Sequence, residues 1–237
     1  MENLIYYLIE RVNWQNSLIF VLLSGGPTLI WLWLCLSFDR SAPEPKIEIF
    51  KIFLWGCLIT LPLIPLAGYL SRLIKGLDWL GPVAFIFILS FLIDGLIEEI
   101  SKYLVLRYRI YQSKHFDELR DGFIYGMTLG LGFAFMENIF YGFLSATTAL
   151  GATTVFLRGF TSTFMHFLSG GIIGYYLGLY KFKNKKSFIF QGIFWAILFH
   201  GLYNTIVRFN WWWNLLPLAI LLLGVYLIIL KRIKKFD

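Results

Sequence analysis

Long apolar runs divide the chain into candidate membrane-spanning segments. A transmembrane helix needs about 20 predominantly apolar residues, because each residue rises about 1.5 Å through roughly 30 Å of hydrocarbon. The runs are continuous and far longer than the roughly ten residues of a tilted barrel strand, which favours helices. The sequence therefore predicts an all-α, polytopic membrane helix bundle of about seven transmembrane helices, near 17–38, 50–74, 82–108, 121–144, 152–180, 187–208 and 212–230.

The composition supports a surface covered mostly by lipid. Hydrophobic residues make up 58% of the chain and charged residues only 15%, whereas soluble domains carry about 25% charge. A soluble enzyme and a disordered chain are therefore excluded, and we interpret residues 1–237 as a single integral membrane domain. Cys35 and Cys57 lie inside apolar runs, outside any metal-binding spacing, and are expected to be buried free thiols.

The basic residues predict how the chain is oriented. The net charge is +7, and fifteen of the 21 Lys and Arg residues fall in one set of alternating loops and the C-terminal tail, against five in the other set. Because basic loops stay in the cytoplasm, we expect a multi-pass cell-membrane protein with its N-terminus outside and its C-terminus inside. Residues Trp211, Trp212 and Trp213 would anchor the outer interface. The charge thus accounts for topology, and no nucleic-acid partner is expected.

Charged and polar side chains interrupt four of the predicted spans. Each ionisable residue at mid-membrane costs roughly 2.5–3.5 kcal/mol on insertion, so these side chains are expected to face one another inside the bundle. The set comprises Asp94, Glu98, Glu99 and Lys102 in the third span, Glu137 and Asn138 in the fourth, Arg158 and His166 in the fifth, and His200 and Asn204 in the sixth.

Helical spacing predicts local partners within this set. Glu98 and Lys102 are four residues apart and can form an ion pair, while Glu99 is directed to another neighbour. His200 and Asn204 are also four residues apart and would project towards a common point. An ion pair that fixes helix register and an interhelical hydrogen bond are the structural alternatives for these two pairs.

Depth in the bilayer constrains the third helix. Counted from the basic ends of their spans, Glu137 and the two histidines lie about 21–24 Å deep, whereas Glu98 would lie only about 13 Å deep if its helix ended at Arg107. Glu98 reaches the same depth as Glu137 and the histidines if the helix continues beyond Arg107 and its basic side chains snorkel to the interface. We therefore expect the third helix to end near residue 113.

Two series of small residues predict where helices pack closely. Residues at four-residue spacing let helix backbones approach one another, and a polar residue lies on the same face in each series. The first series is Gly122, Gly126 and Gly130, followed by Glu137, and the second is His166, Gly170, Gly174 and Gly178.

Carboxylates and histidines gathered in a buried cavity can activate water. The carboxylate takes a proton from the water, and histidine or asparagine side chains stabilise the oxyanion. A metal alternative is also open, with Glu137, His166 and His200 as three ligands and water as the fourth, although the chain has no HExxH motif. An ion- or proton-coupled transporter would use similar residues, but the halves of the chain show no convincing repeat.

Four motifs on successive spans resemble those of the PrsW family of intramembrane proteases. More distantly, they are similar to the type II CAAX-prenyl proteases and to the APH-1 subunit of gamma-secretase. The resemblance covers residues 94–204. The motifs are EExxK at Glu98–Lys102, FxxxEN at Phe133–Asn138, an arginine-histidine-glycine motif from Arg158 through His166 to Gly170, and HxxxN at His200–Asn204.

This resemblance implies an intramembrane endopeptidase. It implies site-1 cleavage of a membrane-anchored anti-sigma factor, a single-span substrate, with a metal-free glutamate mechanism favoured and a divalent metal such as zinc left open. A non-catalytic scaffold of the APH-1 type is the further alternative. The implied catalytic residues are Glu98, Glu99, His166, His200 and Asn204, and the implied supporting residues are Lys102, Glu137, Asn138 and Arg158.

Overall fold

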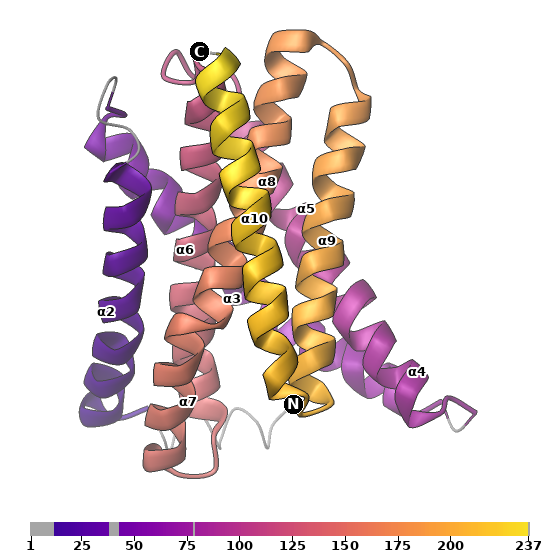
Figure 1. The fold of residues 1–237 in the computed structure, drawn as a ribbon. Helices are drawn as coiled ribbons and strands as arrows, with labels where there is room; N and C mark the ends of the chain where they lie inside the picture. Colours follow the sequence, from indigo (N-terminus) through magenta and orange to yellow (C-terminus); the bar gives the residue numbers. More distant parts are fainter. Residues whose placement is uncertain (1–11, 38–42, 78, 237) are drawn as a thin grey trace.

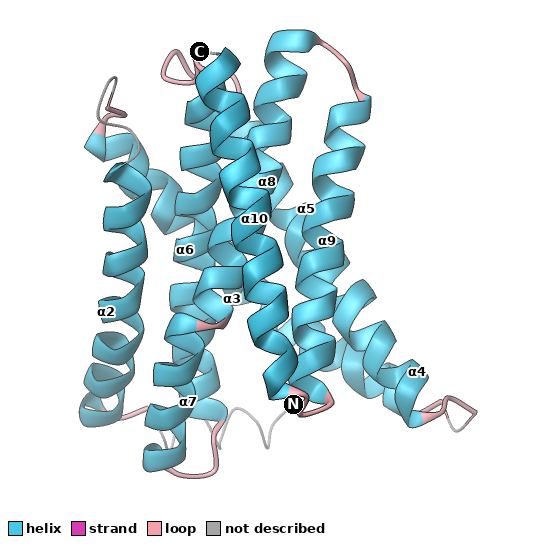
Figure 2. Ribbon diagram, viewed as in Figure 1, coloured by secondary structure: helices cyan, strands magenta, loops and turns pink. Residues whose placement is uncertain are grey.

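A computed structural model describes residues 12–37, 43–77 and 79–236, and the regular structure in these ranges is entirely helical (Figure 2). Five helices are long and apolar enough to cross a membrane. They are α2 (Trp14–Ser37), α3 (Lys46–Lys75), α6 (Leu119–Leu144), α9 (Ser187–Arg208) and α10 (Leu215–Phe236), the last preceded by a short 3-10 turn, Trp212–Asn214. The predicted all-α membrane helix bundle is confirmed. Arg11 and Arg40, counted among the loop charges, and Phe38, the expected end of the first span, lie outside the described ranges.

The two remaining predicted spans are built from shorter segments. The third span is one continuous run of three parts: α4 (Pro82–Phe87), the π-helix η1 (Ile88–Ile97) and α5 (Glu98–Arg109). The fifth span is two helices, α7 (Thr148–Phe160) and α8 (Ser162–Lys183), which meet at Thr161. Both interruptions lie beside the polar side chains, and π-helical turns are frequent at functional sites.

The third helix ends at Arg109, so the predicted end near residue 113 is wrong. The Lys181 ammonium on α8 donates hydrogen bonds to the backbone oxygens of Tyr111 (2.8 Å) and Phe116 (2.5 Å). These bonds hold the connection to α6 in a non-helical path. The prediction assumed that all helices end at the same depth in the membrane. Instead, α5 ends at Arg109, and the non-helical residues 110–118 connect it to α6.

Helices α6 and α8 cross with their backbones in contact. A Cβ atom added to Gly126 would lie 2.2 Å from the backbone oxygen of Gly170, and one added to Gly174 would lie 1.8 Å from that of Gly122. The two predicted glycine series therefore face each other. Most of α6 is buried, with α2 and α3 against one side of it and α8 against another, as Figure 1 shows.

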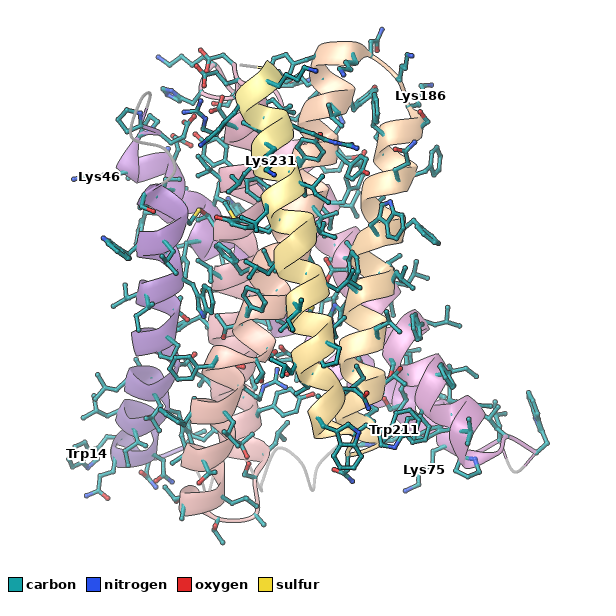
Figure 3. All side chains as sticks on the ribbon, in the orientation of Figure 1. Trp14, Lys46, Lys75, Lys186, Trp211 and Lys231 are labelled. Carbon is teal, nitrogen blue, oxygen red and sulfur yellow. The ribbon has the colours of Figure 1, made fainter. Side chains whose placement is uncertain are left out.

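The labelled lysines and tryptophans show which residues lie at each end of the bundle. Lys46 and Lys186 lie at the end of the bundle that also holds the C-terminus, while Trp14, Lys75 and Trp211 lie at the opposite end (Figure 3). Both cysteines are free and buried, as expected: Cys57 donates to the backbone oxygen of Gly132 at 3.2 Å.

Gly126→Ala should destabilise the protein by about 1–3 kcal/mol, because the added methyl group would overlap the α8 backbone. The free energy of unfolding in detergent measures the effect. The matched control is Gly68→Ala, whose methyl group would meet nothing within 4 Å and whose helix should gain up to about 1 kcal/mol. Equal stability of the two variants would contradict the close crossing.

Candidate active site

Three helices bring two glutamates and two histidines together in the bundle interior. The glutamates Glu98 and Glu99 begin α5, His166 lies on α8 and His200 lies on α9, and all four are buried. The imidazole centroids are 5.0 Å apart and the rings are nearly perpendicular. Glu137 joins them from α6 through His166. The predicted convergence of these residues is confirmed.

Glu99 is the centre of the hydrogen-bond network. Its Oε1 atom accepts hydrogen bonds from the Lys102 ammonium at 2.7 Å, from His200 Nδ1 at 2.6 Å and from the Ser169 hydroxyl at 3.2 Å. Ser169 was missed in the sequence, although it lies three residues after His166 and so on the same helix face.

Lys102 pairs with Glu99 and not with Glu98, so the predicted i,i+4 pair is wrong. At its observed position the ammonium also lies 2.8 Å from His166 Nδ1 and 4.5 Å from the centroid of the Phe133 ring. These three contacts together outweigh a single bond to Glu98, because a fully buried cation needs several partners. Glu98 thereby lacks the Lys102 ammonium as a partner.

The contacts of His200 fix its tautomer. In the neutral imidazole, Nδ1 carries the proton donated to the Glu99 carboxylate and Nε2 keeps a lone pair. That Nε2 atom lies 3.8 Å from Glu98 Oε2. Within the described residues, Glu98 Oε2 is buried and has no hydrogen-bond partner. Two acceptors therefore face each other across a gap that requires a bridging donor or a cation.

His166 is engaged through both nitrogens. Lys102 can only donate, so His166 Nδ1 accepts, and the protonated Nε2 donates to Glu137 Oε2 at 2.9 Å. His166 therefore links Lys102 to Glu137 across the bundle. In this arrangement it has no lone pair left for a proton from water.

Arg158 points into the bundle, where it joins α6 and α7 to α8. Its guanidinium donates to Glu137 Oε2 at 2.7 Å, to Asn138 Oδ1 at 2.9 Å and to the Ser162 hydroxyl at 2.9 Å. Asn138 in turn donates to the Thr163 hydroxyl at 2.9 Å. The break between α7 and α8 thus lies within a polar clamp, which explains why the fifth span is not one straight helix.

Asn204 binds a different partner from His200, so their predicted convergence on a common point is wrong. The Asn204 amide donates to Asp94 Oδ2 at 2.9 Å, and Arg208 reaches the same oxygen at 2.5 Å and the Ser90 hydroxyl at 3.0 Å. Asp94 needs these donors because η1 places it inside the bundle, away from Lys102. Arg208 is the last residue of the predicted sixth span and was not among the candidate site residues, although its spacing of four residues from Asn204 was a usable signal.

A possible metal site has Glu98 in place of Glu137. Among the described residues, donor atoms of Glu98, His166 and His200 lie within 4.8 Å of one another. The predicted set with Glu137 is not formed, because Arg158 and His166 already bind that carboxylate. The unpartnered Glu98 oxygen and the His200 Nε2 lone pair fit a metal ion as ligands. His166 would complete the set through Nε2 on giving up its bonds to both Glu137 and Lys102, because the ring proton would then be on Nδ1.

A buried carboxylate–histidine site inside a helical membrane bundle fits the class of membrane-embedded hydrolases. A family model described as PrsW family intramembrane metalloprotease matches residues 44–230. The chain belongs to this family, and it is a peptidase.

Three similar proteins are each named "Protease PrsW". The protein from Clostridioides difficile (strain 630) is 35% identical over 218 residues, covering 90% of this chain and 87% of that protein. The protein from Oceanobacillus iheyensis is 34% identical over 193 residues, covering 80% and 84%. The protein from Bacillus subtilis (strain 168) is 30% identical over 189 residues, covering 78% and 81%. No solved structure matches the chain.

Lys102→Met should destabilise the protein by about 3–5 kcal/mol, because it leaves the Glu99 carboxylate buried without a cation. Lys51→Met is the matched control: Lys51 also pairs with a glutamate three residues earlier, Glu48, at 2.8 Å, but its side chain is 55% exposed. That exposed pair should be worth at most about 1 kcal/mol. Denaturant unfolding of both variants measures the difference, and equal losses would argue against a buried hub at Glu99.

Proposed function

We propose that the chain hydrolyses a peptide bond of a single-span membrane protein inside the bilayer, using a water molecule held between Glu98 and His200. The observation that carries the proposal is the 3.8 Å gap between two buried acceptors, Glu98 Oε2 and His200 Nε2. A water molecule can donate one hydrogen to each of them. Its oxygen then keeps lone pairs directed away from both, towards an incoming carbonyl carbon.

In this mechanism Glu98 is the general base. Glu98 takes a proton from the attacking water, and His200 holds the water through Nε2. Glu99 is a positioning residue, because its bond to His200 Nδ1 keeps the imidazole in the required tautomer. Lys102 fixes Glu99 in turn. The adjacent glutamates therefore have separate roles.

The remaining polar residues are assigned to the support of the site. His166 and Glu137 hold α8 and α6 at the correct separation, and Arg158 joins α7 to them. Asn204 lies four residues after His200 and donates a hydrogen bond to Asp94, which lies four residues before Glu98. We assign Asn204 to orienting the substrate carbonyl and stabilising its oxyanion at the edge of the water site.

A metal ion held by Glu98 and His200, with His166 as the third ligand, would supply Lewis-acid chemistry and a more acidic bound water. Metal content tests this form of the mechanism separately. If the chain uses a metal, as the family description "metalloprotease" states, the purified protein should contain one equivalent of metal ion. Both Glu98→Gln and His200→Ala should lose this metal. Full activity of a chelated, metal-free protein would assign water activation to Glu98 alone.

The substrate proposed from the family resemblance is a membrane-anchored anti-sigma factor, cleaved at site 1 in the cell membrane. The proposed orientation places the C-terminus in the cytoplasm and the N-terminus outside. The separation of Lys46 and Lys186 from Trp211 along the bundle axis supports this orientation. Reporter fusions after Lys186 and after Asn210 would test it, with cytoplasmic and external signals expected in that order.

Glu98→Gln should reduce cleavage of a co-reconstituted single-span anti-sigma factor by about 10²–10⁴-fold, because the amide cannot take the proton. Glu99→Gln should reduce it less, by about 10–100-fold, because it acts on the chemistry through the orientation of His200. It should also destabilise the protein, because the buried Lys102 ammonium loses its carboxylate partner. Fragment masses from proteoliposomes give the rates and the scissile bond. Glu48→Gln, at an ion pair in the first turn of α3, is the control and should cleave normally.

Unfolding transitions of all three variants must be measured, so that lost activity is not confused with lost structure. Full cleavage by both Glu98→Gln and Glu99→Gln would refute the hydrolytic site. Ion flux in the same liposomes that is abolished by these substitutions, without any cleavage, would establish the transporter alternative instead.

A further inference from the structure

Helix α10 leaves a cationic cavity against its neighbours at the end of the bundle that holds the C-terminus. The cavity has a volume of about 410 Å³ and lies between the last turns of α8 and α10. Three of its seven lining residues are basic, Lys183, Arg232 and Lys235, and none is acidic. Its walls include Tyr175 and an apolar side chain from the start of α6, Leu119.

A second, apolar cavity continues from the first one towards the membrane centre. It has a volume of about 200 Å³ and lies between α8, α9 and α10. Tyr175 and Arg232 line both cavities, so the two lie next to each other. The other α10 residues that line it, Val225, Ile228 and Ile229, lie one to two helical turns deeper than Arg232.

We propose that these two cavities form one binding site for an anionic phospholipid, with the phosphate among Lys183, Arg232 and Lys235 and an acyl chain in the apolar crevice. Two observations support the assignment. The basic side chains complement a negatively charged headgroup, and the lining changes from cationic at the end of the bundle to apolar deeper in the membrane, as it does along a lipid. The cationic part lies at the basic end of the bundle, which is where headgroups reside, and the apolar part lies deeper. Basic pockets between transmembrane helices are suited to anionic headgroups.

A free anion or a peptide would use only part of this site. A soluble phosphate would occupy the cationic cavity and gain nothing from the crevice beside Ile228 and Trp195. An acidic peptide would have to bring its backbone polar groups into the crevice, whose mostly apolar walls offer few hydrogen-bond partners. The site is also separate from the proposed hydrolytic site, since none of the side chains assigned to catalysis lines either cavity.

Lipid competition on the full-length chain in detergent tests the proposal. Native mass spectrometry compares phosphatidylglycerol with phosphatidylcholine of identical acyl chains, so that only the headgroup charge differs. We expect preferential retention of phosphatidylglycerol. Each of the substitutions Lys183→Gln, Arg232→Gln and Lys235→Gln should weaken that retention by about fivefold.

The matched control removes three other cations from the same end of the bundle. Lys185, Lys186 and Lys231 are exposed and line neither cavity. Lys185→Gln, Lys186→Gln and Lys231→Gln together change the net charge as much as the three pocket substitutions, but should leave retention unchanged. An equal loss in this control would show diffuse charge attraction and overturn the site.

The acyl-chain part of the site has its own variant. Ile228→Trp fills the crevice from a position that is 54% exposed, so folding should tolerate it, and the unfolding transition verifies this. It should weaken phosphatidylglycerol retention while leaving the binding of glycerol phosphate to the cationic cavity unchanged. Unaltered lipid retention in this variant, or displacement of the lipid by inorganic phosphate at equal concentration, would refute the lipid and indicate a soluble anion.

Discussion

A carboxylate buried among apolar helices is stable only while donors surround it, and the arrangement of the site depends on how Glu99 meets that condition. Lys102, His200 and Ser169 all converge on one of its oxygens. Each donor comes from a different helix or turn, so satisfying Glu99 also fixes α5, α8 and α9 relative to one another. The tautomer of His200 follows from this bond, and so does the lone pair that faces Glu98. Removal of the hub would therefore disturb structure and chemistry together.

Backbone packing sets the separation at which those side chains meet. A Cβ atom on Gly130 would lie 2.1 Å from the backbone oxygen of His166, so α6 and α8 touch at the level of the site itself. Glu137 lies two turns further along α6 and reaches the His166 ring at 2.9 Å. The glycine series thus does more than pack two helices: it brings the acidic face of α6 within hydrogen-bond distance of the histidine on α8. Small residues and polar residues share one helix face because both act at the same crossing.

The spans, the facing glycines and the gathering of polar residues could be predicted from the sequence, because each follows from a rule about single helices or about the cost of charge in lipid. Partner choice could not. Whether Lys102 binds Glu98 or Glu99 depends on where His166 and Phe133 lie, which is set by the rotation of α5 against α6 and α8. The same holds for Asn204, whose partner Asp94 is presented by a π-helix that residue spacing does not reveal. The end of the third helix was missed because Lys181, 70 residues away, holds the turn after it.

The two adjacent glutamates illustrate why such a site needs unequal neighbours. Consecutive residues on a helix point about 100° apart, so one environment cannot serve both. Each glutamate keeps a buried Oε2 atom without a hydrogen-bond partner in the described part of the chain. They differ in their neighbours: Glu99 Oε1 accepts from three donors and is held fixed, while the free oxygen of Glu98 faces an acceptor, His200 Nε2. If both carboxylates were saturated with donors, neither could take a proton, and if both lacked donors, the helix could not stay in the membrane interior. The division of donors between them makes one glutamate structural and leaves the other able to react, at the cost of a buried acceptor that only a bridging water or cation can satisfy.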